Sequence, residues 1–323
     1  DDVVVRDDGG SEVDLSMVRA HWDRWFDIGR WPVEDLYYGL IQRFVRRLWF
    51  EDPSAMAAWH GKSVVYLANH QVGIESLLFS IAVSGLTGVN TVTLAKEEHR
   101  RSWLGDLIRE SFAWPTAKDP GVITYFDRED RESLPRIIGE LAAELAGGSK
   151  SVMVHVEGTR SLECRTPVQK MSGAFIDMAI GAGAAVVPVR FSGALPVEPL
   201  SERLEFPVDL GAQDIHIGRP MTPEHLSGVP YKERKEAVIA AINSLGPSNA
   251  DESPIASDAA FVGQVRAWME ATGVSWEDAV LRKVLEETTE PCDLTSSLLS
   301  EAALPDDATG RWLAAFRKRL GGR

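Results

Sequence analysis

From Gly61 onward, short apolar runs of strand composition alternate with segments of helical spacing, and this alternation restricts the fold more than any other feature. Helical segments cover residues 76–84, 100–112, 131–146 and 173–181. The strand candidates between and around them are Ser63 to Ala68, Thr91 to Ala95, Val122 to Phe126, Ser151 to Val156, Ala185 to Phe191 and Ile215 to Ile217. The alternation predicts an α/β domain with a mostly parallel central sheet flanked by helices. In such sheets, ligands bind at the carboxyl ends of the strands.

The region before this domain, residues 1–60, is predicted to hold an acid-rich linker or frayed end followed by helices. Apolar residues recur at helical spacing up to Phe50, and Pro32 followed by acidic residues suits a helix start. Arginines lie largely on the other face of this helix. It therefore has two interpretations, a helix packed on the domain or an amphipathic helix on a membrane surface, and we favour packing because most apolar helix faces are buried.

The domain itself is predicted to span residues 61–247 and to end with a helix from Tyr231 to Leu245. Residues Gly246 to Asp258 are rich in Pro, Ser and Asn, which is typical of a linker. A second helical pattern follows and predicts a small C-terminal extension over residues 258–323. No function is evident for this extension from its sequence.

Composition narrows the classes of partner and compartment. The 323 residues are 44% hydrophobic, which is enough for a full core, and the net charge of −14 argues against nucleic acid or anionic lipid as an electrostatic partner. Two cysteines make neither a disulfide framework nor a metal site, so a reducing, cytoplasmic location is expected. No apolar run is long enough to span a bilayer, which leaves peripheral membrane contact as the alternative.

The first stretch that suggests chemistry follows the apolar strand that ends at Ala68. Asn69 and His70 form a polar break there, and Glu75 comes near the start of the next helix. On one regular helix, His70 and Glu75 would not face each other, because five residues span roughly 140° around the axis. With His70 in the turn and Glu75 in the first helical turn, the carboxylate can hold one imidazole nitrogen and leave the other free to accept a proton.

Three further stretches place polar clusters at the ends of apolar strands. One is Tyr125-Phe126-Asp127-Arg128, the second is Val156-Glu157-Gly158-Thr159-Arg160-Ser161, and the third centres on Pro188. Gly158 permits a tight backbone, and Arg160 offers a rigid fork suited to phosphate. Glu157 is predicted to orient that fork or the acceptor, and Arg128 to supply a second cation.

These stretches resemble the four sequence blocks of the glycerolipid acyltransferase family, which includes glycerol-3-phosphate and 1-acylglycerol-3-phosphate acyltransferases. The family's Asn-His, four residues, Asp block is matched by Asn69-His70 through Glu75, with Glu in place of Asp. Its Pro-Glu-Gly-Thr-Arg-Ser block is matched from Val156, which replaces the proline, and Lys96 lies in another stretch common in the family. Because the order and spacing of the blocks agree over roughly residues 60 to 245, the resemblance is specific.

The resemblance implies an O-acyltransferase of phospholipid biosynthesis that uses no metal and no cofactor beyond an acyl thioester of coenzyme A or acyl carrier protein. His70 would be the general base and Glu75 its partner, with backbone N–H groups after His70 stabilising the oxyanion. The acceptor would be a phosphorylated glycerol such as lysophosphatidic acid, giving phosphatidic acid. The implied substrate-binding residues are Asn69, Lys96, Arg128, Glu157, Gly158, Thr159 and Arg160.

Two other classes of function stay open on the sequence. The Asp-to-Glu change at position 75 suits a catalytically weak lipid-binding module. The acidic start and lack of a membrane anchor suit the acyl-release domain of a multidomain fatty-acid or polyketide synthase. A nucleotide-binding loop at Gly61 or at Gly181-Ala182-Gly183 is set aside because the strand and helix context is wrong, and the latter is predicted as a helix end. His155, inside a strand, is predicted as a satisfied core or near-site residue and not as a zinc ligand.

Overall fold

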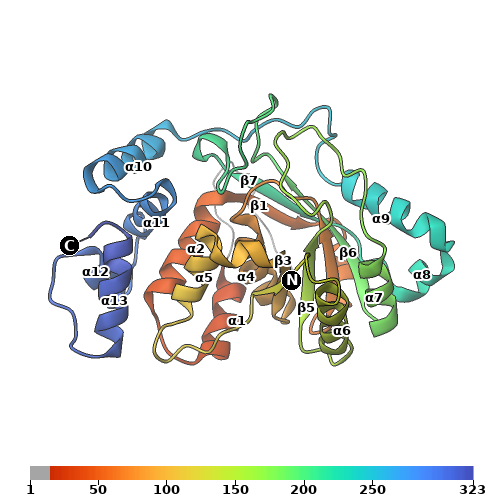
Figure 1. The fold of residues 1–323 in the computed structure, drawn as a ribbon, viewed down its shortest axis with the longest axis horizontal. Coiled ribbons are helices and arrows are strands. Elements are labelled where there is room, and N and C mark those ends of the chain that lie inside the picture. Colours follow the sequence, from red (N-terminus) through yellow and green to blue (C-terminus); the bar gives the residue numbers. More distant parts are fainter. Residues whose placement is uncertain (1–14, 323) are drawn as a thin grey trace.

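A single sheet with helices on both faces organises residues 15–322, the part of the chain that the computed structural model describes (Figure 1). The strand order across the sheet is β1-β7-β6-β2-β5-β3-β4. Neighbouring strands pair in parallel except β6 and β7, which are antiparallel, so the predicted α/β class with a mostly parallel sheet is confirmed. The strands are β1 Val45–Phe50, β2 Val64–Ala68, β3 Thr91–Lys96, β4 Ile123–Phe126, β5 Ser151–His155, β6 Ala185–Ser192 and β7 Gln213–Ile217.

Helices cover both faces of this sheet and extend beyond one side of it (Figure 1). In chain order they are α1 Ser16–Phe26, α2 Pro32–Phe44, α3 Pro53–Ala57, α4 Glu75–Thr87, α5 Trp103–Ser111, α6 Ser133–Ala146, α7 Ala174–Ala182, α8 Pro223–Gly228, α9 Arg234–Asn243, α10 Ala259–Thr272, α11 Trp276–Glu286, α12 Asp293–Leu299 and α13 Ala308–Arg319. Short 3-10 turns are η1 Glu97–Arg101, η2 Val208–Leu210 and η3 Tyr231–Glu233. Gly183 ends α7 in the left-handed region at φ 68°, which confirms the predicted helix end there.

The central strand β2 explains why the sheet is buried on both sides. Side chains alternate across a strand, so Tyr66 and Ala68 join one core with α1, α2 and α4, while Val65 and Leu67 join the other with α6, α7 and α9. All five residues of β2 are buried. A strand buried on both faces requires a continuous apolar run, and β2 has one. The polar residues Asn69 and His70 follow Ala68 at the carboxyl end of this strand.

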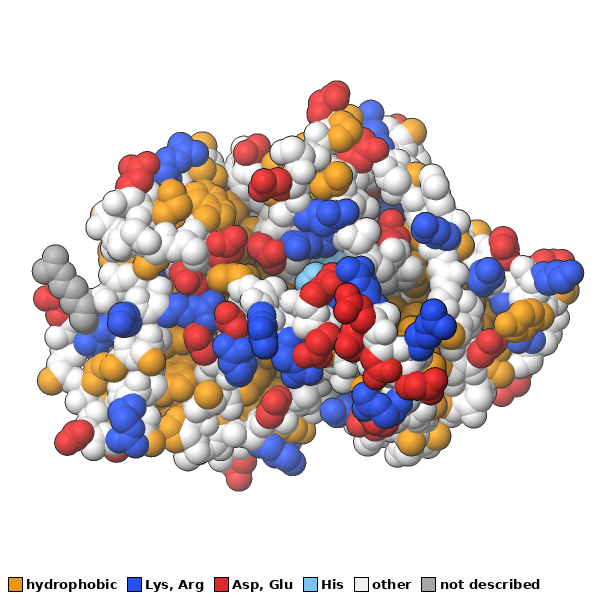
Figure 2. Space-filling model, viewed as in Figure 1, with side chains coloured by type: hydrophobic (Ala, Val, Ile, Leu, Met, Phe, Trp, Pro, Cys, Tyr) orange, Lys and Arg blue, Asp and Glu red, His pale blue; other side chains and the backbone are white. Residues whose placement is uncertain are grey.

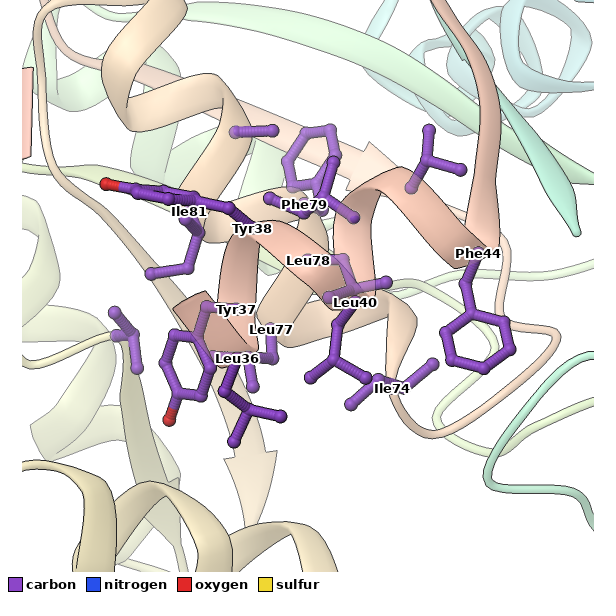
Figure 3. Packing of buried hydrophobic residues seen from close by; sticks show 14 of the residues in the cluster. Leu36, Tyr37, Tyr38, Leu40, Phe44, Ile74, Leu77, Leu78, Phe79 and Ile81 are labelled. Carbon is purple, nitrogen blue, oxygen red and sulfur yellow. The ribbon is translucent and has the colours of Figure 1, made fainter. Parts of the chain in front are cut away.

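Helix α2 lies inside the molecule, packed on α4. Figure 3 shows Leu36 and Leu40 of α2 close to Leu77 and Leu78 of α4, and Phe44 of α2 close to Ile74, the residue before α4. These side chains are at most 2% exposed. The packed-helix interpretation of this region is therefore correct, and its placement on a membrane surface is wrong, because the apolar face that would enter lipid is already covered by protein.

The strand β1 corrects the sequence prediction, which continued the helical pattern to Phe50. The helix ends at Phe44, and β1 pairs in parallel with β7. Val45 and Leu48 are both buried although they are three residues apart, because the register shifts between Val45 and Arg47 as in a β-bulge. That irregular spacing imitates a helix, and pairing with a distant strand overrides it.

The C-terminal helices pack together beside α2, on the left of Figure 1. The buried carboxylate of Asp35 in α2 accepts hydrogen bonds from the backbone N–H of Cys292 at 2.8 Å and from the Thr295 hydroxyl at 2.6 Å. α2 is thus tied to the start of α12. The proposed boundaries at residues 60, 247 and 258 stay predictions, and the predicted acidic linker at the N-terminus lies almost entirely outside the described residues. Within residues 15–322, every helix is too short or too polar to cross a bilayer.

Candidate active site

A cavity of about 360 Å³ opens at the carboxyl ends of the parallel strands. Its wall is built from the ends of β3, β4 and β5, the loop before α4, the first turns of α5, α6 and α7, and from Arg203 and Glu205. His70, His155, Lys96, Gly158, Thr159 and Arg160 all line it. Figure 2 shows histidine atoms near the middle of this face, with basic and acidic side chains gathered around them. The ends of β2, β4 and β5, which carry three of the four predicted stretches, therefore meet at one place, whereas Pro188 of β6 does not line the cavity.

His70 and Glu75 are in contact at the floor of this cavity. β2 ends at Ala68, His70 lies in the turn, and α4 begins at Glu75, so His70 Nδ1 lies 2.7 Å from Glu75 Oε1. The Glu75 side chain is fully buried, and it also accepts hydrogen bonds from the Gln71 and Val72 backbone N–H groups and from Gln213 Nε2. These donors fix the carboxylate, which accepts the Nδ1 proton. His70 Nε2 then faces the cavity as a proton acceptor, and no group in residues 15–322 hydrogen-bonds to it.

His155 forms a second layer against His70. The two rings are stacked with centroids 3.6 Å apart and planes 10° apart. His155 Nδ1 lies 2.7 Å from the Asn69 carbonyl oxygen and therefore carries its proton, so Nε2 accepts the hydrogen bond from Ser76 Oγ at 2.8 Å. Both nitrogens of His155 are satisfied, as the sequence analysis predicted for a core or near-site residue.

The stack does not suit a shared metal ion. His70, Glu75 and His155 offer ligand-type atoms within 4.8 Å of one another. A metal binds an imidazole nitrogen in the plane of the ring at about 2.0–2.1 Å. Because these two planes are nearly parallel and well separated, an ion in the plane of one ring would lie far out of the plane of the other.

Burial controls the protonation of this cluster. Burial lowers the pKa of His70 well below its usual range, and the nearby cations Arg160 and Lys96 lower it further. Burial lowers the pKa of His155 to about 3, and a proton on His70 would lower it in the same direction. Both rings are therefore neutral at pH 7, the state in which an imidazole can accept a proton.

Two of the predicted residues have roles other than those expected. Glu157 accepts a hydrogen bond from the His70 backbone N–H at 3.1 Å, instead of orienting Arg160, and burial raises its pKa to about 7. Arg128 is exposed and pairs with Glu98 at 3.2 Å, and it does not line the cavity. A charge this exposed is drawn to the nearest surface carboxylate, so it does not join Arg160 in this structure.

Asn69 holds the loop and does not face the cavity. Its side chain donates to the Phe191 carbonyl at 2.9 Å and accepts from the Phe191 N–H at 2.7 Å, which ties the end of β2 to β6. The expected oxyanion donors directly after His70 are also occupied. The N–H groups of Gln71 and Val72 bind Glu75, while those of Gly73 and Ile74 bind the carbonyls of residues 204 and 205. That prediction is wrong for these four groups, because the turn uses them to fold.

Arg160 has a neighbour that the sequence analysis missed. Its Nη1 donates to the Leu204 carbonyl at 2.6 Å and to Glu205 Oε1 at 2.7 Å, and Arg203 Nε donates to the Arg160 carbonyl at 3.0 Å. Arg203 and Glu205 both line the cavity. They lie in an irregular segment without a motif or periodic pattern, so no sequence signal marked them.

Comparison with known proteins agrees with this geometry. Residues 49–192 match the protein-family model described as Acyltransferase. This part of the chain is therefore similar to the domain of acyltransferases. The family match ends at the last residue of β6, so the candidate site also draws on residues beyond it, including Arg203 and Glu205.

No curated protein matches the chain significantly. Among solved structures, the chain is similar to the 1-acyl-sn-glycerophosphate (LPA) acyltransferase PlsC from Thermotoga maritima. The identity is 19% and the TM-score 0.41, and the alignment covers 71% of this chain and 90% of that chain.

Proposed function

We propose that the protein is an O-acyltransferase that moves a fatty acyl chain from a thioester of coenzyme A or acyl carrier protein to a phosphorylated glycerol acceptor. Lysophosphatidic acid is the proposed acceptor and phosphatidic acid the product. The observation that carries the proposal is the neutral His70, held by Glu75 at Nδ1 and open to the cavity at Nε2. The acceptor is a membrane lipid, so transient contact of a cytoplasmic protein with the membrane is part of the proposal.

The proposed chemistry is direct acyl transfer. His70 Nε2 takes the proton of the acceptor hydroxyl while its oxygen attacks the thioester carbonyl. The tetrahedral intermediate collapses with loss of the thiolate, which receives the proton from His70. Glu75 stabilises the imidazolium that exists between these two transfers. The thioester provides the leaving group, so the proposed reaction needs no metal and no further cofactor.

The lining of the cavity supports two substrate regions. Lys96, Arg160 and Arg203 provide positive charge for a phosphate, and holding the acceptor there is itself catalytic because it orients the hydroxyl. A second part of the wall is apolar and suits an acyl chain. Its side chains are Leu94, Ile123, Phe126, Leu134, Val154 and Phe175.

His70→Ala is the direct test of this function. We expect kcat to fall by about 10²- to 10⁴-fold because the general base is lost. The assay uses a panel of acyl-coenzyme A and acyl-carrier-protein donors with glycerol-3-phosphate and lysophosphatidic acid. His225→Ala, an exposed histidine of α8, is the control. Normal turnover by His70→Ala would exclude the role of His70, and lipid binding without any turnover would favour a binding module.

Glu75→Asp tests whether glutamate suits this site. The Glu75 carboxylate reaches His70, two backbone N–H groups and Gln213 together, and a side chain shorter by one methylene cannot keep all of these contacts. We therefore expect kcat to fall by about tenfold or more, as it does when a positioned catalytic group shifts. A large gain in kcat would show that the glutamate weakens the pair.

A further inference from the structure

Glu205 occupies the position on Arg160 that an anionic substrate group would need. Its Oε1 accepts a hydrogen bond from Arg160 Nη1 at 2.7 Å, and both side chains line the cavity that contains His70. A carboxylate and a phosphate present similar oxygen acceptors to a guanidinium. A phosphate approaching this face of Arg160 therefore meets a negative charge already in place.

The position of Glu205 is fixed by the backbone of the catalytic loop. The Gly73 N–H donates to the Leu204 carbonyl at 3.0 Å, and the Ile74 N–H donates to the Glu205 carbonyl at 2.9 Å. Gly73 also has no side chain, and a Cβ atom there would collide with the Glu205 carboxylate. Residues 204 and 205 are thus attached to the turn that follows His70, and Glu205 is not a chance surface neighbour of Arg160.

The pair is built so that it can exchange partners. The side chain of Arg160 is 16% exposed and that of Glu205 is 22% exposed, so solvent and ligand reach both. The other guanidinium of the segment, Arg203, is exposed and lines the same cavity. A phosphate can therefore displace the Glu205 carboxylate or bind beside it, and in either case it must overcome the attraction of Glu205 for Arg160 or the repulsion from its charge.

We propose that Glu205 is a specificity-determining residue that competes with the acceptor's phosphate for Arg160 and thereby sets the affinity of the site for that group. This inference rests on the proposed function, because it assumes that Arg160 receives the phosphate. According to this proposal, the Glu205 side chain alone lowers the affinity of the site for phosphomonoesters. Acceptors without a phosphate are not subject to the competition.

Glu205→Gln tests the proposal with little change of shape, because glutamine can still accept the hydrogen bond from Arg160. We expect the KM for lysophosphatidic acid to fall by about tenfold, since removal of a like charge next to the phosphate favours binding. The kcat and the KM for the acyl donor should change less than the KM for lysophosphatidic acid, because the competition acts on the binding of the phosphate. The KM for a monoacylglycerol of the same chain length should also stay unchanged.

Glu202→Gln is the matched control, because Glu202 belongs to the same segment, is exposed and does not line the cavity. It removes the same charge and should leave every KM as in the wild type. Calorimetric titration with glycerol-3-phosphate repeats the comparison without turnover, and tighter binding to Glu205→Gln alone is the expected result. A purely structural role of Glu205 would lower stability or kcat and would not improve phosphate binding.

Arg160→Met separates failure of this inference from failure of the proposed function. If Arg160→Met raises the KM for lysophosphatidic acid while Glu205→Gln leaves it unchanged, the competition is wrong and the phosphate role of Arg160 stands. If neither variant changes this KM or the binding of glycerol-3-phosphate, Arg160 does not hold the phosphate, and both statements are wrong. Equal gains in Glu205→Gln and Glu202→Gln would reduce the effect to general surface charge and overturn the proposal.

Discussion

Two arginine–glutamate pairs join the loop after His70 to later parts of the chain, and they differ in their surroundings. Arg190 and Glu252 are buried, with side chains 3% and 1% exposed, whereas Arg160 and Glu205 face the cavity. The buried pair is saturated with partners. Arg190 also donates to the Leu245 and Pro247 carbonyls, and Glu252 also accepts from Gln71 Nε2 and the Gly193 N–H.

The same two residue types therefore perform different tasks. A buried charge without its partner is costly, so the Arg190–Glu252 pair has no freedom to receive a ligand. A partly exposed pair contributes little to stability and can exchange partners. The first pair fixes residues 246–252 under the catalytic loop, and the second is available for recognition.

The largest difference is expected in stability. Arg190→Met leaves the buried charge of Glu252 unpaired, and we expect the free energy of unfolding to fall by about 3–5 kcal/mol. Arg160→Met, at the cavity, should lower it by about 1 kcal/mol or less. Urea unfolding of both variants measures the two values. Similar losses in the two variants would abolish the distinction between a structural and a recognition pair.

Gln71→Met examines how the buried pair reaches the active site. The Gln71 side chain joins Glu252 to the Ala194 N–H, and its backbone N–H binds Glu75. Leaving these buried groups unpaired should cost about 1–3 kcal/mol of unfolding free energy. Because the turn that positions Glu75 loses its anchor, kcat should fall while the KM for the acceptor stays near the wild-type value. A change confined to that KM would place Gln71 in recognition instead.

His155→Phe tests whether burial at the floor of the cavity, beside Arg160 and Glu205, excludes a proton from His155. The folded-state pKa of His155 is about 3 against an ordinary value of 6.5, so between these pH values the unfolded chain binds a proton that the folded chain excludes. Wild-type stability should therefore fall as pH decreases from 6.5 toward 3. Phenylalanine removes this contribution, up to about 1.4 kcal/mol per pH unit. An unchanged slope of unfolding free energy between pH 6 and pH 5 would contradict the assignment.

The smallest effect is expected for the stability of Glu205→Gln. The pair is partly exposed and glutamine keeps the hydrogen bond, so the free energy of unfolding should change by less than about 1 kcal/mol. Thermal and urea unfolding provide the measurement. A loss as large as that of Arg190→Met would make Glu205 a structural residue and remove the basis for its role in phosphate affinity.

The sequence was informative where a pattern is local. Apolar runs located β2 through β6, and the most continuous of them belong to the buried strands β2 and β6. The contact between His70 and Glu75 followed from their place at the end of one strand and the start of one helix. β1 was missed because its bulge spaces Val45 and Leu48 as a helix would.

The partners of the motif residues were less predictable. Gln71, Arg203, Glu205 and Glu252 contact the site from segments without periodicity, and which of them meet depends on how distant loops close. Residues Gly246 to Asp258 resemble a linker in composition, yet Glu252 within them is 2% exposed. A single buried charge in a polar segment leaves no pattern that propensity or spacing can detect.

The pairing of β1 with β7 has a consequence for folding of the protein during its synthesis. Arg46, the second residue of β1, donates a hydrogen bond to the Asp214 carboxylate of β7, and 168 positions separate the two residues in the chain. During synthesis, β1 therefore emerges long before the strand that completes it. A strand without its neighbour leaves backbone groups free to pair with other chains, and contacts between distant residues form slowly. A chaperone that covers β1 until β7 has been synthesised should therefore increase the fraction of the protein that reaches its native state.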